Sequence, residues 1–409
     1  MTGRKVYTAI GLMSGTSLDG VDAALIRTDG HDVAEPLGFV SLAYEAALRD
    51  KLRACLGRSD RDAADIREAE RLMTAAHVEA VRALPGADGA EVIGFHGQTI
   101  LHNPRPLIKK GGSGGVTVQL GDAGLLAAET GIDVVHDFRS ADVRAGGQGA
   151  PFLPLYHRAR AAKLDKPLAV LNIGGVANVT YINNVPPPLR EGVRGRVLDM
   201  AQSSNIEHPH DSLHPHPIPP PQGGGDYFEG EILAFDTGPG NALLDDFVRE
   251  RTGRDFDEYG KLAEAGKVAE DILAQWMEHP YFKSKPPKSL DRNAWDVSDV
   301  KGLNDADGAA TLAAFTARAV IAALDHMPQK PKAWYVTGGG RKNETIMNYL
   351  KTHLKNVAPV EDIGWNGDAL EAEGFAYLAV RSLLGLPLSV PGTTGVKTPM
   401  TGGVLTRCR

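Results

Sequence analysis

Two segments of this sequence share one pattern, in which an apolar strand, a glycine-rich turn and a second apolar strand follow one another. The first segment, AIGLMSGTSLDGVDAALI, begins at residue 9, and the second, AVLNIGGVANVTYI, begins at residue 169. Such a repeat predicts two related α/β domains that face each other across a cleft, with both turns pointing into it. Two unrelated β-hairpins with ordinary glycine turns are the alternative.

Further short apolar runs that end in glycine alternate with longer amphipathic patterns, which is typical of sheets covered by helices. The 409 residues are about 2.7 times the roughly 150 expected for one domain, so we expect two large α/β domains. We predict helices over residues 64–84, 241–251, 260–278, 306–325, 342–355 and 368–384.

Charge and cysteine content exclude several classes of protein. The formal net charge is −7 and no long Lys/Arg run occurs, so the sequence lacks the basic surface that nucleic-acid binding requires. Two cysteines, Cys55 and Cys408, are too few for a disulfide framework or a four-cysteine zinc site. No apolar run approaches the roughly 20 residues that span a bilayer. We therefore expect a cytoplasmic protein that binds neither nucleic acid nor membrane.

Residues 183–230 interrupt the alternation of strands and helices. They are rich in proline and histidine, contain few apolar side chains and show no regular period. A segment of this kind cannot bury enough apolar surface to offset the entropy lost on ordering. We predict a flexible insertion between two strands, whose role the sequence leaves open.

The first glycine-rich turn has the composition of an anion-binding loop. Backbone N–H groups and hydroxyls can converge there on a phosphate without bulky side chains in the way. The turn also carries two carboxylates, which require a cation beside a phosphate, and Mg²⁺ is the natural one. The residues concerned are Gly15, Thr16, Ser17, Asp19, Gly20 and Asp22. A polar hairpin without a ligand is the alternative.

Two further glycine turns follow predicted strands. Gly174 and Gly175 form a second candidate for anion binding. The third consists of Gly338, Gly339 and Gly340, where the backbone could lie flat against a planar group such as adenine. Three such turns in one chain favour a nucleotide-binding protein, although the Walker A pattern is absent.

The motif FDTGPGN places a carboxylate at the end of an apolar strand. Asp236 ends the strand, Gly238 and Gly240 allow a tight turn, and Asn241 is suited to cap the following helix. In α/β enzymes catalytic groups lie at this end of a strand. Asp236 is therefore the candidate catalytic residue, and a structural aspartate that caps its own turn is the alternative.

Polar residues also gather at the ends of two other predicted strands, in GFHGQTI and DFRSADVRAGGQGAP. Because they lie among glycines, we interpret them as groups that orient a ligand in a cleft. Each alone is equally compatible with an ordinary loop residue. They are His96, Gln98, Asp137, Arg139 and Gln148.

Taken in order, these motifs resemble those of the anhydro-N-acetylmuramic acid kinase family, which belongs to the actin, hexokinase and heat-shock ATPase superfamily. The resemblance extends over residues 6–405 apart from the insertion, and its last motif is EAEGFAYLA. It implies two related actin-like (ribonuclease H-like) domains that flank a nucleotide and substrate cleft. Domain I would comprise residues 1–145 and 386–409, and domain II would comprise residues 146–385.

The resemblance also implies an activity. Family members are phosphotransferases that use ATP to open the 1,6-anhydro ring of anhydro-N-acetylmuramic acid with water and to phosphorylate O6. The product, N-acetylmuramic acid 6-phosphate, is formed in peptidoglycan recycling. Asp236 matches the catalytic base of the family, and Glu371 matches a second active-site carboxylate, with Glu373 as the alternative.

Further site residues follow from the resemblance. The GTSLDGVD turn matches the ATP-binding loop of the family, which adds Leu18 and Val21 to the nucleotide site. Gly238 joins the polar residues above as a substrate contact. The expected cofactors are ATP and Mg²⁺, and the protein ligands of Mg²⁺ stay unassigned. The amino sugar and ATP are the expected partners, and a homodimer is left open.

Two other functions compete with this one. A conventional sugar kinase would keep the fold and phosphorylate an existing hydroxyl group. A nucleotide-dependent scaffold or regulator would bind ATP without catalysis, but the presence of Asp236 and Glu371 argues against it.

Overall fold

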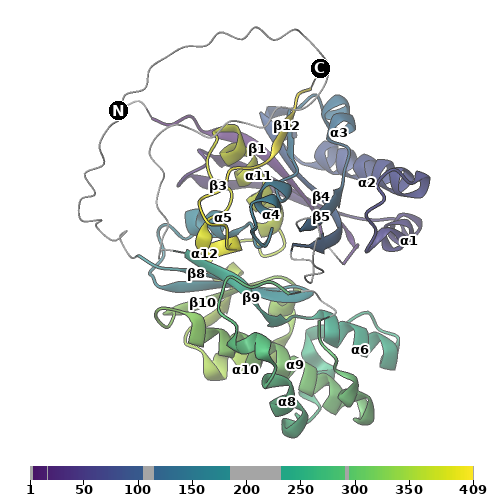
Figure 1. Ribbon diagram of the computed structural model, residues 1–409, viewed down its shortest axis with the longest axis vertical. Coiled ribbons are helices and arrows are strands. Elements are labelled where there is room, and N and C mark those ends of the chain that lie inside the picture. Colours follow the sequence, from purple (N-terminus) through teal and green to yellow (C-terminus); the bar gives the residue numbers. More distant parts are fainter. Residues whose placement is uncertain (1–2, 16, 105–114, 185–231, 291–293, 409) are drawn as a thin grey trace.

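The computed structural model describes residues 3–15, 17–104, 115–184, 232–290 and 294–408 (Figure 1). Thr16 and residues 185–230 of the predicted insertion lie outside the described residues. The described chain forms two α/β halves, each built on one sheet, and Figure 1 shows the first half above the second.

The first half is built on a sheet with the order β12-β6-β4-β1-β2-β3, in which β5 also pairs with β4. Its central strands are almost continuously apolar, as expected for strands that are covered on both faces. The strands are β1 (Tyr7–Ser14), β2 (Gly20–Thr28), β3 (Ala34–Ala43), β4 (Val92–Asn103), β5 (Val116–Leu120), β6 (Val134–His136) and β12 (Val404–Thr406).

The second half is built on a sheet with the order β11-β10-β7-β8-β9. Its strands are β7 (Leu168–Ile173), β8 (Val176–Ile182), β9 (Ile232–Pro239), β10 (Ala333–Thr337) and β11 (Val357–Pro359). Ile182 at the end of β8 lies opposite Ile232 at the start of β9, so the strands before and after the predicted insertion are neighbours.

The two sheets share one topology. β1 is antiparallel to β2 and parallel to β4, and β2 is antiparallel to β3. In the same way, β7 is antiparallel to β8 and parallel to β10, and β8 is antiparallel to β9. Beyond β4 and β10, the strands β6 and β11 continue in parallel. The two repeated hairpins are therefore equivalent elements, which confirms the prediction of two related α/β domains.

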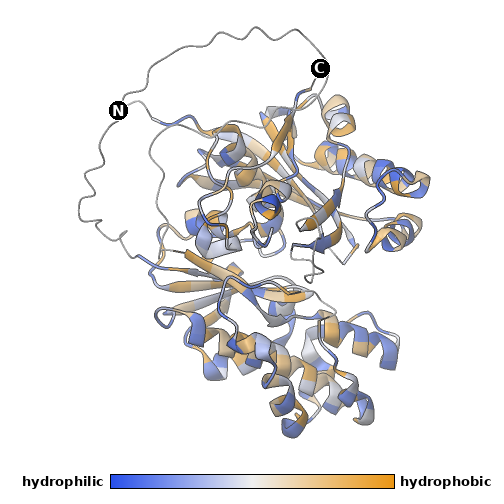
Figure 2. Ribbon diagram, viewed as in Figure 1, coloured by the Kyte–Doolittle hydropathy of each residue, from blue (hydrophilic) through white to orange (hydrophobic). Residues whose placement is uncertain are grey.

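Amphipathic helices cover the sheets and turn their apolar sides inward (Figure 2). In the longest helix of the first half, Ile66, Ala69, Met73 and Ala80 are buried at the three-, four- and seven-residue spacings of one helix face. The helices are α1 (Ala46–Cys55), α2 (Ala64–Ala83), α3 (Ala123–Thr130), α4 (Ser140–Arg144), α5 (Pro154–Arg160), α6 (Ala242–Thr252), α7 (Lys261–Glu264), α8 (Glu270–Met277), α9 (Asp305–Ala322), α10 (Glu344–His353), α11 (Leu370–Leu383) and α12 (Pro391–Thr394).

The single helix predicted over residues 260–278 is wrong, because α7 and α8 are separate helices. Between them the backbone approaches α9 so closely that a Cβ atom at Gly266 would lie 2.0 Å from the carbonyl oxygen of Ala306. This tertiary contact directs the chain out of the helical path. The other predicted helices are present to within a few residues, and the last turn of the one predicted over 306–325 is a 3₁₀ helix, Ala323–His326.

Helix α11 lies in the part of the chain predicted as domain II, yet it packs against β1, β2 and β4 of the first sheet. Glycines permit this close contact. A Cβ atom at Gly11 would lie 1.7 Å from the carbonyl oxygen of Ala372, and one at Gly94 would lie 2.1 Å from that of Phe375. A domain boundary at residue 385 therefore separates α11 from the sheet that it covers.

One described helix is long and apolar enough to cross a membrane, which corrects the expectation that no apolar run approaches that length. It is Asp305–His326, which consists of α9 and the turn after it. Its most apolar stretch is 72% buried within the protein, and α9 packs against α6, α8, α10 and β9. α9 is thus the core helix of the second half.

Candidate active site

Asp236 is only 9% exposed and lies within β9, which continues to Pro239, so the expectation that Asp236 ends its strand is wrong. The segment 281–290 holds it on three sides. Asp236 Oδ2 accepts a hydrogen bond from the Leu290 N–H (2.7 Å), the Asp236 N–H donates to the Lys288 carbonyl (3.0 Å), and the Tyr281 hydroxyl donates to the Asp236 carbonyl (2.6 Å). Burial raises the pKa of Asp236 to about 7, although the Leu290 N–H and the charge of Arg139 oppose the shift.

Sequence reasoning missed the residues that hold Asp236. Lys288 Nζ donates to the Tyr281 carbonyl (2.9 Å) and lies 3.2 Å from His326 Nε2, and burial lowers the pKa of Lys288 to about 8. The neighbouring Ser289 hydroxyl donates to Gln148 Oε1 (2.8 Å). The sequence offers one signal for these residues. It is the polar run KSLDRN, which follows two prolines and begins 52 residues after Asp236.

Gln148, a predicted substrate contact, connects this segment to the first half. It is 5% exposed, and its N–H donates to the carbonyl of Thr394, the last residue of α12 (2.7 Å). Its carbonyl oxygen lies 3.0 Å from His102 Nε2 on β4. Gln148 is therefore next to the segment that holds Asp236, as a cleft residue should be.

Arg139 and His96 form a second polar pair. Arg139 Nε donates to His96 Nε2 (3.1 Å), and His96 Nδ1 lies 2.7 Å from the Gly97 carbonyl, so we assign the ring proton to Nδ1. Burial, with the charge of Arg139, holds the pKa of His96 well below its usual value, so the ring is neutral. Burial lowers the pKa of Arg139 to about 10, while the charges of Glu371, Asp142 and Asp236 raise it. Arg139 is thus a cation near both candidate carboxylates.

Glu371 lies in the first turn of α11 and is half-buried. Its Oε1 accepts a hydrogen bond from Asn172 Nδ2 on β7 (3.2 Å), so it connects the two halves. Burial raises its pKa, and so does the charge of Asp22, against the lowering effect of Arg139 and of the bond from Asn172. Glu371 therefore lies where the two sheets meet.

Glu373, the alternative to Glu371, has a different environment. It is 2% exposed, and its Oε2 accepts hydrogen bonds from the Tyr156 hydroxyl and from Arg160 NH1 (2.9 Å). Two positions on a helix are about 200° apart, so the two glutamates point in opposite directions. Glu373 is engaged in an internal ion pair, which supports Glu371 as the site residue.

The first glycine-rich turn carries the predicted carboxylates. Burial raises the pKa of Asp22 to about 6, although a hydrogen bond from Ser41 opposes the shift, and the charge of Asp19 adds to it. The Ser17 hydroxyl donates to Asp19 Oδ1 (2.8 Å). In this turn Leu18 adopts a positive φ of 58°.

Three of the residues predicted in this turn have packing roles. The side chains of Leu18 and Val21 are buried in the core of the first half, so only their backbone can face a ligand. A Cβ atom at Gly20 would lie 2.2 Å from the Leu42 carbonyl oxygen, so β3 already requires a glycine there. Gly15 has more room, with the Ser17 hydroxyl as nearest atom at 3.3 Å.

The second turn is held by backbone hydrogen bonds from the FDTGPGN motif. The Gly174 carbonyl accepts from the Asn241 N–H (2.7 Å), and the Gly175 carbonyl accepts from the N–H groups of Gly240 (3.1 Å) and Ala242 (3.2 Å). A Cβ atom at Gly240 would lie 2.2 Å from the Gly174 oxygen. Gly240 is therefore required by this contact.

The third turn packs against the second. Gly338 has a φ of +76°, and a Cβ atom there would lie 2.3 Å from Asn172 Oδ1. A Cβ atom at Gly340 would lie 2.3 Å from Ile173 Cγ2. A Cβ atom at Gly339, by contrast, would lie at an ordinary contact distance of 3.5 Å from Asn241 Nδ2. The second turn, the third turn and the start of α6 thus form one cluster.

Three other predicted substrate contacts have internal roles. A Cβ atom at Gly238 would lie 2.5 Å from that of Ala319, so α9 requires this glycine. Asp137 Oδ1 accepts the Ser140 N–H at the start of α4 (3.3 Å). Gln98 is completely buried, and its amide is hydrogen-bonded to the protein.

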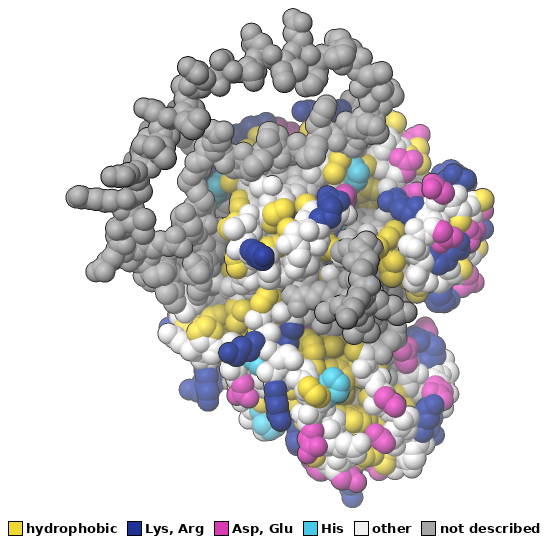
Figure 3. All heavy atoms as spheres, in the orientation of Figure 1, with side chains coloured by type: hydrophobic (Ala, Val, Ile, Leu, Met, Phe, Trp, Pro, Cys, Tyr) yellow, Lys and Arg dark blue, Asp and Glu magenta, His cyan; other side chains and the backbone are white. Residues whose placement is uncertain are grey.

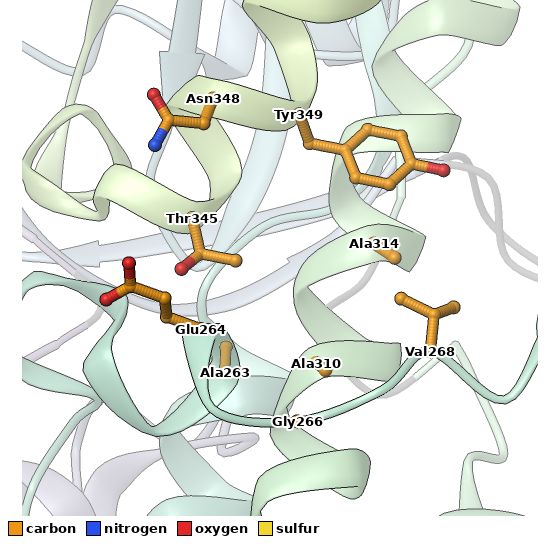
Figure 4. A pocket seen from close by; sticks show the side chains of 9 residues that line it. All are labelled: Ala263, Glu264, Gly266, Val268, Ala310, Ala314, Thr345, Asn348 and Tyr349. Atoms are coloured by element: carbon orange, nitrogen blue, oxygen red, sulfur yellow. The ribbon is translucent and has the colours of Figure 1, made fainter.

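A cavity or a metal site elsewhere among the described residues would be an alternative to this site. A cavity of about 260 Å³ lies between α7, α9 and α10, and Figure 4 shows its lining, which includes Thr345 and Tyr349. No predicted site residue lines it. Within the described ranges, no group of three or more His, Cys, Asp or Glu residues could hold a metal ion.

Comparison with known proteins identifies the family. The model of the anhydro-N-acetylmuramic acid kinase family matches residues 7–190 and 228–407. A protein of that name from Rhodospirillum rubrum is 47% identical over 399 residues, which cover 97% of this chain and 93% of that protein. Another, from Rhizorhabdus wittichii, is 46% identical over 410 residues and covers 98% of both chains.

Solved structures are more distant. A ROK family glucokinase from Streptomyces griseus has a TM-score of 0.38 at 13% identity and covers 91% of this chain and 99% of that chain. A xylulose kinase from Lactobacillus acidophilus has a TM-score of 0.40 at 11% identity and covers 92% and 89%. Likenesses of this size do not bear on the activity. The family model and the relatives that match over nearly the full length show that this chain belongs to the anhydro-N-acetylmuramic acid kinase family.

Proposed function

We propose that this chain opens the 1,6-anhydro ring of anhydro-N-acetylmuramic acid with water and transfers the γ-phosphoryl group of ATP to the freed O6. The products are N-acetylmuramic acid 6-phosphate and ADP, and the pathway is peptidoglycan recycling. One observation carries the proposal: in a member of this kinase family, a buried carboxylate on β9, Asp236, has a pKa near neutrality.

Asp236 is suited to accept a proton from water. Leu290 holds Oδ2, so we assign proton acceptance to Oδ1. A base with a pKa near the working pH is most effective, and such catalysis typically contributes ~10²–10⁴-fold. As the water oxygen bonds to C1, the C1–O6 bond breaks. O6 then attacks the γ-phosphorus of ATP, and the bond from that phosphorus to the bridging oxygen breaks, so that ADP leaves. The water proton remains on Asp236 until it passes to solvent.

Glu371 and Arg139 supply charge around the reacting atoms. Positive charge that develops at C1 is stabilised by a nearby carboxylate, as in glycosidases, and Glu371 is the candidate. Arg139 lies close enough to Glu371 and Asp236 to influence both electrostatically, and it can neutralise negative charge that develops on O6. We assign His96 to hold Arg139 in place, because its neutral Nε2 accepts the guanidinium N–H.

We assign the nucleotide to the three glycine turns. Gly174 and Gly175 support this assignment, because packing within the protein does not require glycine at either position. A Cβ atom at Gly175 would meet its nearest neighbour, Ala242, at 3.6 Å, and one at Gly174 would meet Val176 at 3.7 Å. Phosphates that approach the backbone closely would explain why side chains are absent there.

For the metal, we propose Mg²⁺ bound with ATP. The carboxylates of the first glycine-rich turn fit this ion, because the charge of Asp19 adds to the rise that burial causes in the pKa of Asp22, and a cation would relieve that repulsion. Mg²⁺ commonly takes one or two carboxylates and completes its coordination with phosphates and water. When bound, the ion supplies positive charge to the transferring phosphoryl group.

We further propose a cytoplasmic location, since the reaction consumes ATP, and small molecules as partners. On the face shown in Figure 3, acidic and basic side chains are interspersed, which favours neither nucleic acid nor an acidic membrane surface. For the domains, we propose that α11 moves with the first sheet, so that domain I comprises residues 1–145 and 370–409. A homodimer stays open to measurement by light scattering.

The substrate and reaction can be tested together. The protein is incubated with MgATP in H₂¹⁸O with anhydro-N-acetylmuramic acid, N-acetylmuramic acid or glucose. We expect one ADP per anhydro sugar consumed, and immediate quenching should show ¹⁸O at C1 of the product. Faster phosphorylation of N-acetylmuramic acid or glucose would instead indicate a conventional sugar kinase. ATP binding without turnover of any sugar would indicate a nucleotide-dependent regulator.

A further inference from the structure

Tyr44 connects both sides of the first glycine-rich turn. It follows β3 directly, and its N–H donates to the Asp19 carbonyl at the end of the turn (2.9 Å). Its hydroxyl reaches back to the start of the turn and donates to the Ser14 Oγ atom (2.8 Å). Tyr44 is 4% exposed and Ser14 is 1% exposed, so both groups are removed from solvent.

A chain of donors continues from Tyr44 into the turn. The Ser14 hydroxyl donates to Gln98 Oε1 (2.6 Å), and Gln98 Nε2 donates to the Gly15 carbonyl (3.2 Å). Gln98 Nε2 also lies 3.2 Å from the Thr99 carbonyl, which fixes the orientation of the amide. Hydrogen bonds that follow one another in this way polarise and strengthen one another in a buried site.

Local backbone geometry brings Gln98 to this position. Gly97 has a φ of +70°, and a Cβ atom there would lie 2.1 Å from the Leu120 carbonyl oxygen. The register between β1 and β4 shifts next to it, so that Ser14 rather than its neighbour lies opposite Gln98. A glycine and a β-bulge thus aim one buried amide at the turn.

The Gly15 carbonyl is held from two sides, by Gln98 Nε2 and by the Leu18 N–H (3.2 Å). A carbonyl oxygen that faced a phosphate would repel it. With its oxygen fixed toward the protein, the turn can present its N–H groups and hydroxyls to an anion without reorganising.

We propose that Tyr44, acting through Ser14 and Gln98, is a positioning residue that holds the first glycine-rich turn in its ATP-binding shape. This inference rests on the proposed function for the identity of the ligand, and it reassigns Gln98 from the sugar to the turn. Tyr44 itself does not touch the nucleotide.

The test compares Tyr44→Phe with Tyr377→Phe. The first substitution removes the hydroxyl and keeps the ring and the N–H bond to Asp19. The second is a control in the same half, because Tyr377 is completely buried and its hydroxyl donates to the His31 carbonyl (2.8 Å), while also accepting a long hydrogen bond from Arg381 NH1 (3.4 Å). Both should cost similar stability, which thermal unfolding checks.

We expect Tyr44→Phe to raise the KM and the calorimetric Kd for ATP by about three- to tenfold, the equivalent of one lost hydrogen bond, and to leave the sugar KM within about twofold. Tyr377→Phe should change neither. Ser14→Ala should weaken ATP binding to a similar degree, and the double variant no further, because both act through Gln98.

Unchanged ATP affinity in Tyr44→Phe and Ser14→Ala would overturn the inference, and so would an equal loss in Tyr377→Phe. If Tyr44→Phe fails to fold, Ser14→Ala decides the outcome alone. The Kd measurement needs no turnover. A protein that binds ATP but phosphorylates no sugar would therefore refute the proposed reaction and leave this inference to be judged on binding.

Discussion

The turns that open the two halves lie at equivalent places in two sheets of the same topology, but they are held differently. The turn between β1 and β2 is held mainly by side chains, through Tyr44, Ser14 and Gln98. The turn between β7 and β8 is held by backbone, through N–H groups of residues 240–242 that bond to Gly174 and Gly175. Two turns at equivalent places in the same topology are therefore stabilised by different kinds of hydrogen bond.

The difference predicts different responses to substitution. A turn held by side chains can be loosened by removing one hydroxyl group. A turn held by backbone hydrogen bonds keeps its shape when side chains around it are shortened. It responds to an added Cβ atom, which either collides with the protein or occupies the space of the ligand. The halves also contribute different carboxylates, since Asp236 belongs to β9 of the second sheet and Glu371 to the helix over the first.

The largest effect is expected at the carboxylate of the second half. Asp236→Asn keeps the shape of the side chain but cannot take a proton from water, so kcat should fall by ~10²–10⁴-fold while ATP still binds. In the unchanged protein, kcat/KM should fall as the pH drops below about 7, because Asp236 then becomes protonated. Steady-state kinetics measures both effects, with Asp246→Asn as the control, because Asp246 is an exposed aspartate on α6. Full activity of a folded Asp236→Asn protein would exclude this base.

At the first half, Glu371→Gln and Glu373→Gln should separate catalysis from stability. We expect Glu371→Gln to reduce kcat by about 10–10³-fold with little change in unfolding temperature. Glu373→Gln should instead destabilise the fold by about 3 kcal/mol, because it leaves the buried Arg160 without its counter-ion. Kinetics and thermal unfolding of both variants decide the matter, and the reverse pattern would identify Glu373 as the site residue.

The backbone-held turn can be examined with two glycine variants. Gly175→Val should weaken ATP binding by about tenfold and leave the fold intact, because the protein itself has room for the Cβ atom. Gly240→Ala should destabilise the protein by about 2 kcal/mol or more, because its Cβ atom would collide with the Gly174 oxygen. Calorimetry measures the ATP affinity of Gly175→Val, and chemical denaturation measures the stability of Gly240→Ala. Unchanged ATP affinity in Gly175→Val would remove this turn from the nucleotide site.

The smallest effect is expected from deleting residues 186–226, which lie outside the described residues. The strands on either side, β8 and β9, pair from Ile182 and Ile232 onward, so a short connection can join them. Shortening a loop changes its closure free energy by only about 0.6 kcal/mol per halving. Yield of soluble protein and kcat should stay near those of the full chain. Insoluble product would mean that the segment is structural.

Local pattern predicted much of this fold. The two hairpins, the strand before Asp236 and the helix α2 follow from apolar periodicity and glycine punctuation, which act within a few residues. β3 has no such local pattern, because Pro36 and Gly38 interrupt it and much of the strand is exposed. α11 could not be assigned to the first half, because its partners, Gly11 and Gly94, lie hundreds of residues away.

The candidate site divides in the same way. Asp236 and the glycine turns can be recognised from the local sequence. Glu371 and Glu373 can be told apart only by their partners in the fold, which are Asn172 for Glu371 and Arg160 for Glu373. Gln98 looked like a ligand contact because it is polar and near glycines, yet its amide faces inward. Lys288 and Leu290 depend on a tertiary contact with β9 that no local pattern contains.

The central claim is that both halves supply one site, and coupled binding tests it most directly. Calorimetry would measure the Kd for MgATP of the Asp236→Asn protein with and without saturating anhydro-N-acetylmuramic acid, and then the Kd for the sugar with and without MgATP. If both ligands bind in one site that the two halves form together, each should tighten the binding of the other by the same factor, about fivefold or more. Equal affinities with and without the second ligand would contradict a shared site.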